Sequence, residues 1–271
     1  MNNSMVEHIM RKLVKESTNY ENRIFLPEAA KAFRRISSLS DVANMIVEAC
    51  PKDSFGFILR YGYPFARLGG ERANYREIAF ASFKEIEGKF NQENFSELLW
   101  SKFKEKCEVR NVGINKKINE NLVKRLSRFA QDKGNLFLWV KREIEKSERL
   151  ESVFLSLVNN GGMGKKTTSF FLRDVIWLCN LENNIIRSDR LYVQPVDRWI
   201  REIAKILWDD FKNMRYNNDY FDLVISKRIA ETCIQSDLSG LAFNQGAWYY
   251  GSNVVKRKED LHNKLQSLLS A

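Results

Sequence analysis

The sequence predicts an all-α protein, and three observations carry this prediction. Apolar residues recur three and four positions apart along most of the chain, as on the buried face of a helix. Stretches that alternate between apolar and polar residues, as half-buried strands do, are few. Only four prolines interrupt the pattern, Pro27, Pro51, Pro64 and Pro195.

Length and composition are those of a folded protein with a substantial core. The chain has 271 residues, of which 44% are hydrophobic and 29% are charged. These fractions are ordinary for a folded domain. A chain of this length can bury one large core or two closely associated ones.

The first half of the chain is expected to form a series of helices. Pro27 lies near the first turn of its helix, where a missing N–H is tolerated. Asp41 is expected to cap the next helix, and Pro51 to end it. An aromatic segment, Phe55–Phe65, is interpreted as a short core helix followed by a turn, and Arg67–Arg72 as a polar loop. The predicted helices cover residues 5–15, 27–36, 40–50, 75–89, 95–107, 115–132 and 136–148.

The stretch from Glu151 to Leu178 predicts two helices joined by a tight turn. Three glycines, Gly161, Gly162 and Gly164, lie within four residues and would break any helix that contained them. Glycine allows positive φ and a close approach of the backbone to another molecule. The turn amides and the start of the second helix would favour a bound phosphate.

A second helix start follows at Asp197, which directly precedes an apolar-periodic run that begins with Trp199 and Ile200. An aspartate at this position is a good N-cap, because its carboxylate accepts a backbone N–H of the first turn. Two further helices are expected over residues 221–232 and 256–269. Between them lies a polar and aromatic stretch, Leu241–Tyr250.

The net charge favours a polyanionic partner. Lysine and arginine number 44 against 34 acidic residues, which gives a formal charge of +10 and a sequence pI near 9.4. The helix over residues 115–132 carries one basic face. We interpret that face as solvated, with contact to DNA as the alternative.

Taken together, the two motifs resemble the helix-hairpin-helix DNA glycosylase superfamily over roughly residues 150–208. The match consists of Gly-x-Gly-x-Lys-Thr at residues 162–167 and Pro-Val-Asp at residues 195–197, each at a helix start. The resemblance implies that Lys166 is the nucleophile and that Asp197 assists it, with Lys165 as a rival nucleophile. It also implies that the hairpin binds DNA phosphates through Gly162, Met163, Gly164, Lys165 and Thr167.

Two departures from the common pattern bear on the branch of the superfamily. The gap between Lys166 and Asp197 is 31 positions (197 − 166), longer than in most members. The extra length lies around Leu181–Tyr192 and is expected to be a surface excursion, as in the archaeal-type 8-oxoguanine DNA glycosylase/AP lyase branch. Gly161 stands where many relatives carry proline.

The resemblance implies a fold of two helical lobes with the active site in the cleft between them. One lobe would contain residues 1–114 plus 209–271, and the other, with the hairpin, residues 115–208. Gln245 with Trp248 and Tyr249 would hold the extruded base, although the two rings could equally be core aromatics. The rings of Phe55–Phe65 could likewise belong to a lesion pocket or a DNA wedge.

The resemblance implies a bifunctional DNA glycosylase/AP lyase of base excision repair that removes 8-oxoguanine from damaged double-stranded DNA. The alternatives are a monofunctional glycosylase for another damaged base and a non-catalytic DNA-binding module. No cofactor and no metal are expected, because there are two histidines and the four cysteines lie far apart. The sequence lacks a membrane span and a signal peptide, so we expect a cytoplasmic, nucleoid-associated monomer.

Overall fold

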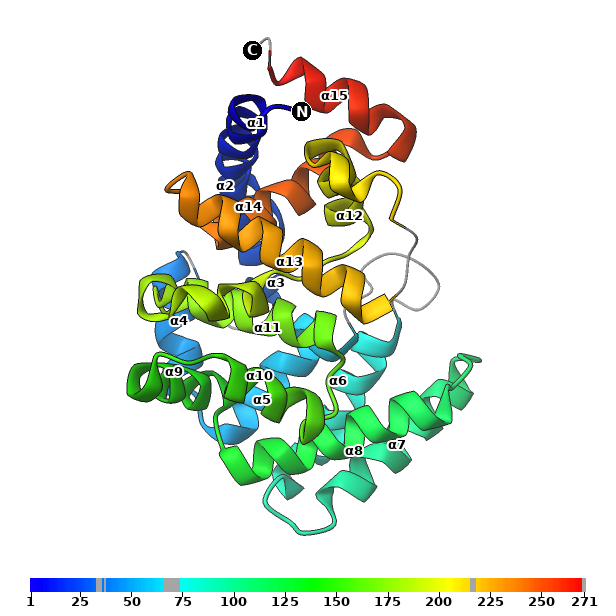
Figure 1. Ribbon diagram of the computed structural model, residues 1–271. Coiled ribbons are helices and arrows are strands. Elements are labelled where there is room, and N and C mark those ends of the chain that lie inside the picture. Colours follow the sequence, from blue (N-terminus) through cyan, green and yellow to red (C-terminus); the bar gives the residue numbers. More distant parts are fainter. Residues whose placement is uncertain (33–35, 37, 66–73, 215–217, 270–271) are drawn as a thin grey trace. The chain divides into compact units, whose positions relative to one another are not determined.

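The structure, a computed structural model, describes residues 1–32, 36, 38–65, 74–214 and 218–269 (Figure 1). Helices, and no strands, make up the regular structure of these residues. The expected all-α class is therefore confirmed. Within this described part of the chain, no helix combines the length and the hydropathy of a membrane-spanning segment.

The chain forms two compact units. Unit 1 contains Met1–Pro27 and Ile185–Ala271, and unit 2 contains Glu28–Asn184. These boundaries differ from those of the expected lobes, 1–114 plus 209–271 and 115–208. The reason lies in packing: the helices that follow residue 28 pack against the hairpin helices of unit 2, and only the first 27 residues belong with the C-terminal segment.

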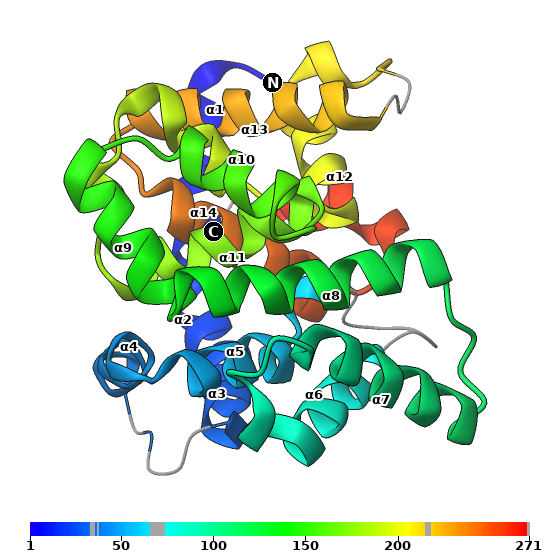
Figure 2. The ribbon, with the colours of Figure 1, turned by 90° about the horizontal axis from the view of Figure 1, so that it is seen from below.

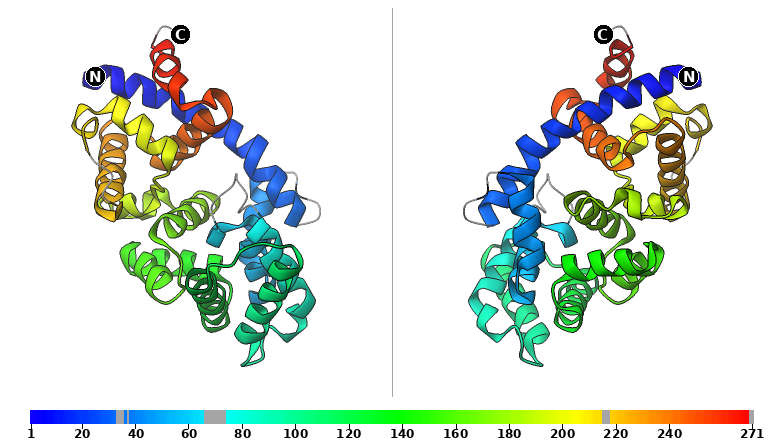
Figure 3. Two further views of the ribbon diagram at one scale, coloured as in Figure 1. Left: turned by 90° about the vertical axis from the view of Figure 1, so that its right-hand side faces the viewer. Right: turned by 90° about the vertical axis from the view of Figure 1, so that its left-hand side faces the viewer.

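A long helical segment begins unit 1 (Figure 3). It comprises α1 (Asn3–Lys15), α2 (Ser17–Tyr20) and a π-helical segment, η1 (Glu21–Phe25). The apolar residues of α1 are spaced so that they share one face, and this face is buried. The expected helix over residues 5–15 corresponds to α1.

Pro27 lies near the start of the next helix, and helical backbone also precedes it. Helix α3 (Leu26–Ala32) follows η1 without a break, and the N–H of Leu26 donates to the carbonyl of Glu21. Proline lacks an N–H, and in an α-helix its ring collides with the carbonyl four residues earlier. The π turn directly before Pro27 changes the backbone spacing there, which lets the chain stay helical. The expected helix with a proline near its first turn is therefore present, but it continues an earlier helical segment.

Helix α14 (Gly240–Tyr249) packs against α1 and α2 in unit 1. Gly246 permits this contact, since a Cβ at this position would lie 1.8 Å from the carbonyl oxygen of Leu13. The sequence predicted no helix over this stretch. This helix is buried on several faces, so its apolar residues do not show the one-sided spacing of an amphipathic helix.

The remaining helices of unit 1 surround α14. Helices α12 (Arg198–Leu207) and α13 (Asn218–Gln235) both contact it, and α15 (Leu261–Ser267) contacts α12. The expected helices over residues 221–232 and 256–269 correspond to α13, which is longer, and α15, which is shorter. Short 3-10 or π segments connect them: η5 (Arg187–Val193), η6 (Asp209–Phe211), η7 (Tyr250–Val255) and η8 (Lys258–Asp260).

The segment before α12 is only partly a surface excursion. It contains η4 (Glu182–Asn184) and η5, and η5 packs against α13. Leu181, Ile185 and Asp189 are buried. Much of this extra length therefore contributes to the core.

Unit 2 begins with α4 (Leu39–Glu48) and α5 (Pro51–Tyr61). Ser38, not Asp41, caps α4: its hydroxyl accepts the Asp41 N–H at 3.1 Å, while the Asp41 carboxylate accepts the Ser38 N–H at 2.9 Å. This reciprocal arrangement is a capping box. Pro51 begins α5 instead of merely ending α4, because proline suits the first helical turn.

The aromatic segment is part of the core of unit 2. Phe55, Phe57, Tyr61 and Tyr63 are each at most 3% exposed. Phe57 and Tyr63 contact the ring of Phe137. The core interpretation of this segment is confirmed for its described residues, whereas the predicted loop Arg67–Arg72 lies outside the residues that the structure describes.

The other helices of unit 2 are α6 (Asn74–Ile86), α7 (Phe95–Val109), α8 (Lys116–Lys133) and α9 (Leu136–Ser147), with the 3-10 segments η2 (Tyr63–Phe65) and η3 (Glu87–Lys89). Helix α8 runs alongside α7 and contacts α5 and α9 (Figure 2). These helices lie close to the residues expected from the sequence, because each has a regular apolar face.

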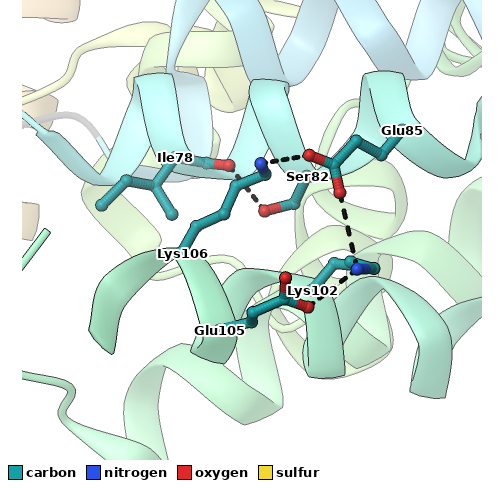
Figure 4. Close-up of polar contacts among 6 residues, drawn as sticks. All are labelled: Ile78, Ser82, Glu85, Lys102, Glu105 and Lys106. Carbon is teal, nitrogen blue, oxygen red and sulfur yellow. Dashed lines mark hydrogen bonds and ion pairs between the residues drawn. The ribbon is translucent and has the colours of Figure 1, made fainter. Parts of the chain in front are cut away.

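A network of charges joins α6 and α7 on the surface of unit 2 (Figure 4). The carboxylate of Glu85 accepts a hydrogen bond from Lys106 and lies 3.7 Å from Lys102, which in turn bonds Glu105 at 2.8 Å. The hydrogen bond from Lys106 is the main cause that lowers the pKa of Glu85 below its ordinary value of 4.5. The network ties two helices together.

We predict that Glu85→Gln lowers the melting temperature at pH 7 but not in acid. A carboxylate whose pKa is lowered by folding stabilises the protein above its unfolded pKa of 4.5. That contribution is lost as the pH falls through the folded pKa. Thermal unfolding at several pH values should show the difference from the parent protein vanish below pH 4.5. Glu93→Gln, at an exposed position, is the control, and a difference that does not depend on pH would contradict the prediction.

We also predict that Gly246→Ala destabilises the protein by about 3 kcal/mol or more, the upper end of the cost of overpacking. The added methyl group would meet a backbone oxygen at 1.8 Å, so α14 must shift away from α1. The control is Gly88→Ala, where the added carbon meets nothing within 4 Å. Urea unfolding measures both, and equal stability of the two variants would refute the packing argument.

Candidate functional site

The two motif helices are joined by a short turn, as the sequence predicted. At the end of helix α10 (Glu151–Asn159), the N–H groups of Asn160 and Gly161 donate hydrogen bonds to the carbonyl of Ser156, at 2.8 and 3.1 Å. Helix α11 (Lys165–Leu178) begins after Gly164. The N–H of Met163 donates back to Leu157 at 3.2 Å, which closes the turn.

Two of the turn glycines are required by geometry. Gly162 has a φ of +70°, and a Cβ there would lie 3.1 Å from Cβ of Arg125 and 3.2 Å from the carbonyl oxygen of Asn121. A Cβ on Gly161 would lie 2.8 Å from the Leu157 carbonyl oxygen. The turn is therefore packed tightly between α8 and the end of α10, and any side chain at these positions would open it.

The turn offers fewer anion-binding amides than the sequence implied. The N–H of Met163 donates within the turn, and the Met163 side chain is 2% exposed. Met163 therefore holds the turn in place. The amides of Gly162 and Gly164 donate to no other residue of the described chain. Both lie at the positive end of α11, where an anion is favoured.

Three expected site residues occupy the first turn of α11. Lys165 is exposed, while Lys166 and Thr167 are half-buried. The hydroxyl of Thr167 donates to the Gly164 carbonyl at 2.7 Å, so it braces the turn. The next residue, Thr168, is fully buried, and its hydroxyl has no partner within the described chain.

Helix α11 contains a buried ion pair that the sequence interpretation did not identify, and the carboxylate of this pair also bonds Tyr63 of another element. Arg173 and Asp174 are 2% and 0% exposed, and the Arg173 guanidinium donates to Oδ1 of Asp174 from Nε at 2.9 Å and from Nη2 at 2.8 Å. The Tyr63 hydroxyl donates to Oδ2 at 3.2 Å. The guanidinium also lies 4.7 Å from the centre of the Phe170 ring. In the sequence, the indication of such a pair is that two adjacent residues of opposite charge lie within an apolar run.

Among the described basic side chains of α8, Lys124 and Arg128 are engaged in ion pairs. Lys124 lies 2.5 Å from Glu97 and 2.8 Å from Glu120, and Arg128 lies 2.8 Å from Glu97. These pairs support the interpretation of a solvated face. Arg125 differs, because it is exposed and its side chain lies against Gly162 of the turn.

Asp197 is the N-cap of α12, as predicted. Its Oδ1 accepts the N–H of Ile200 at 2.9 Å, and its backbone is extended. Behind it, the apolar face of α12 is buried in unit 1 through residues that include Trp199 and Ile203. The carboxylate itself is half-buried.

The residues expected to hold a base are partly committed to the core of unit 1. Trp248 is half-buried, and its ring meets Tyr20 edge-on at 5.8 Å. Tyr249 is 5% exposed, and its hydroxyl accepts a 3.4 Å hydrogen bond from Arg23. These contacts favour the alternative interpretation of both rings as core aromatics. Gln245 is 1% exposed, and its Nε2 has no partner within the described chain.

The expected catalytic residues are divided between the units. Lys165 and Lys166 belong to unit 2, whereas Asp197 and Gln245 belong to unit 1.

The cysteines show no reactive arrangement in the described chain. Burial raises the pKa of the Cys107 and Cys179 thiols to about 11. All four cysteines are free thiols. Among the described residues, no three or more histidine, cysteine, aspartate or glutamate side chains cluster so that they could hold a metal ion.

Comparisons of the chain with models of known protein families, with curated proteins and with solved structures found no match.

We predict that Asp197→Ala lowers the free energy of unfolding by about 1 kcal/mol, the usual cost of losing an N-cap. Asp197→Asn should be close to the parent protein, because asparagine caps a helix as well as aspartate does. Urea unfolding of both variants tests the cap. If asparagine costs as much as alanine, the carboxylate stabilises the protein through its charge and not through the cap.

Proposed function

We propose that the protein is a DNA glycosylase with AP lyase activity. The observation that carries the proposal is the position of Lys166, whose amine lies in the first turn of α11 directly after a tight Gly-x-Gly turn. Such a turn can approach a DNA backbone closely, and it would bring the amine to a deoxyribose next to the bound phosphate. Asp197, the N-cap of α12, supplies the carboxylate of the Pro-Val-Asp motif.

The hairpin would bind DNA phosphates without reading the base sequence. The amides of Gly162 and Gly164 point to this role because no described residue accepts from them. Lys165 adds an exposed positive charge, and Arg125 adds another beside Gly162. Arg125 is thus a phosphate-binding residue that helical spacing alone could not place at the turn.

The proposed chemistry starts with the unprotonated amine of Lys166. It attacks C1′ of the deoxyribose, the bond from C1′ to the base breaks, and the base departs with the electron pair. Opening of the sugar ring and loss of a proton from the nitrogen give a Schiff base. Removal of a proton from C2′ then expels the 3′ phosphate by β-elimination. The Asp197 carboxylate would stabilise the positive charge that develops on the sugar.

The proposed substrate is 8-oxoguanine in damaged double-stranded DNA, and the proposed active form is a monomer. To reach C1′, the protein must extrude the nucleotide from the stack. The long gap between Lys166 and Asp197 supports the 8-oxoguanine branch. The second candidate is a non-catalytic DNA-binding module, which the self-contained packing of the hairpin within unit 2 would also permit.

We predict that Lys166→Gln abolishes strand cleavage at 8-oxoguanine, because the amide cannot form a Schiff base. Each protein is incubated with duplexes that carry 8-oxoguanine, thymine glycol or 3-methyladenine, and strand nicking is scored before and after treatment with alkali. The matched control is Lys165→Gln, which should weaken binding and keep cleavage.

Each of the other outcomes would indicate a different function for this protein. Cleavage that requires alkali indicates a monofunctional glycosylase, and salt-dependent binding without product indicates a binding module. Loss of cleavage in Lys165→Gln alone transfers the nucleophile role to Lys165. Faster release of another base than of 8-oxoguanine refutes the substrate assignment.

A further inference from the structure

Gln194 is a buried amide whose polar atoms have no partner. Its side chain is 1% exposed, and neither Oε1 nor Nε2 makes a hydrogen bond within the described chain. Burying an amide without hydrogen bonds costs on the order of 1–3 kcal/mol, so native structures rarely leave one unpaired. Such an exception calls for a ligand, a water molecule or a functional reason.

The backbone around Gln194 is firmly held. Its carbonyl accepts the Ser226 hydroxyl at 2.9 Å, and its N–H donates to Leu191 at 3.2 Å. The next carbonyl, that of Pro195, accepts the side chain of Asn244 at 3.1 Å. The unpaired amide is therefore attached to a fixed support.

A second buried amide adjoins the same hydrogen bond in sequence. Gln194 precedes Pro195 in sequence, and Gln245 follows Asn244, so each glutamine neighbours one partner of this bond. Nε2 of Gln245 is also unpaired. Unit 1 thus contains three unpaired amide atoms, and they belong to two elements that contact each other, η5 with its cap and α14.

We propose that Gln194, with Gln245, reads the extruded base, and that Oε1 of Gln194 accepts the N7–H that distinguishes 8-oxoguanine from guanine. The inference rests on the proposed function. It assigns the reading of the lesion to a residue next to the Pro-Val-Asp motif and places that residue three positions before Asp197.

The chemistry of the two bases makes an amide a suitable reader. On its major-groove edge, guanine presents two hydrogen-bond acceptors, N7 and O6. In 8-oxoguanine N7 carries a proton, so the edge presents a donor beside an acceptor. One amide pairs with both, Oε1 with N7–H and Nε2 with O6. Against guanine one of the two amide atoms stays unpaired, which costs binding free energy.

Both amides are covered in the chain without DNA, so the side chains that cover them must move to admit a base, while the backbone of Gln194 stays in place.

The test uses the full chain carrying Lys166→Gln, which cannot react, and measures its affinity for three duplexes. These contain 8-oxoguanine, guanine, or a tetrahydrofuran abasic analogue that has no base to read. Adding Gln194→Met should weaken binding to 8-oxoguanine about tenfold or more, because a hydrogen-bonding site loses its partner. Binding to the abasic duplex should not change. Gln235→Met, at an exposed glutamine of α13, is the matched control and should change neither affinity.

The melting temperature provides an independent readout. Replacing an unpaired buried amide with an apolar side chain of similar size should leave the melting temperature unchanged or raise it. A lower melting temperature would mean that the amide is satisfied within the fold, and it would overturn the proposal. So would unchanged affinity for 8-oxoguanine, or an equal loss on the abasic duplex. Lack of DNA binding by the Lys166→Gln protein itself would instead refute the proposed function, and this inference with it.

Discussion

Helix α11 depends on a carboxylate that has no access to water. Asp174 is 0% exposed and is neutralised by the adjacent Arg173, whose guanidinium is also buried. Removing one partner of a buried ion pair leaves an uncompensated charge and costs several kcal/mol. Because Tyr63 donates to the same carboxylate, α11 is tied to the aromatic core of unit 2 as well as to its own chain. The hairpin at its start is therefore mounted on a rigid element.

This rigidity matters for the chemistry that we propose. A nucleophile gains most of its advantage when its position is fixed before the substrate arrives. Lys166 lies two turns before Asp174 on the same helix, and Gly162 is wedged against α8, so both ends of the first turn are constrained. Asp197 is fixed in a different way, through the cap of α12 in unit 1. Each unit thus presents one preorganised group.

The sequence predicted those features that local rules determine. The all-α class, the glycine turn and the Asp197 cap follow from periodicity, from φ preferences and from capping chemistry. It did not predict the π turn before Pro27 or the cap at Ser38, since both depend on backbone geometry a few residues away. The unit boundaries and the unpaired amide of Gln194 depend on contacts between distant segments, which no local pattern encodes. The amide of Met163 was expected to bind a phosphate, and in the fold it donates to the carbonyl of Leu157, a contact that the local pattern does not encode.

The central claim is that the amine of Lys166 attacks the sugar, and one measurement tests it directly. The protein is incubated with a duplex that contains 8-oxoguanine, the Schiff base is reduced with borohydride, and the covalent complex is digested and mapped by mass spectrometry. The account predicts a sugar remnant on the peptide that contains Lys166, attached to that lysine. A remnant on Lys165 or on the amino group of Met1, or the absence of any covalent complex, would contradict it.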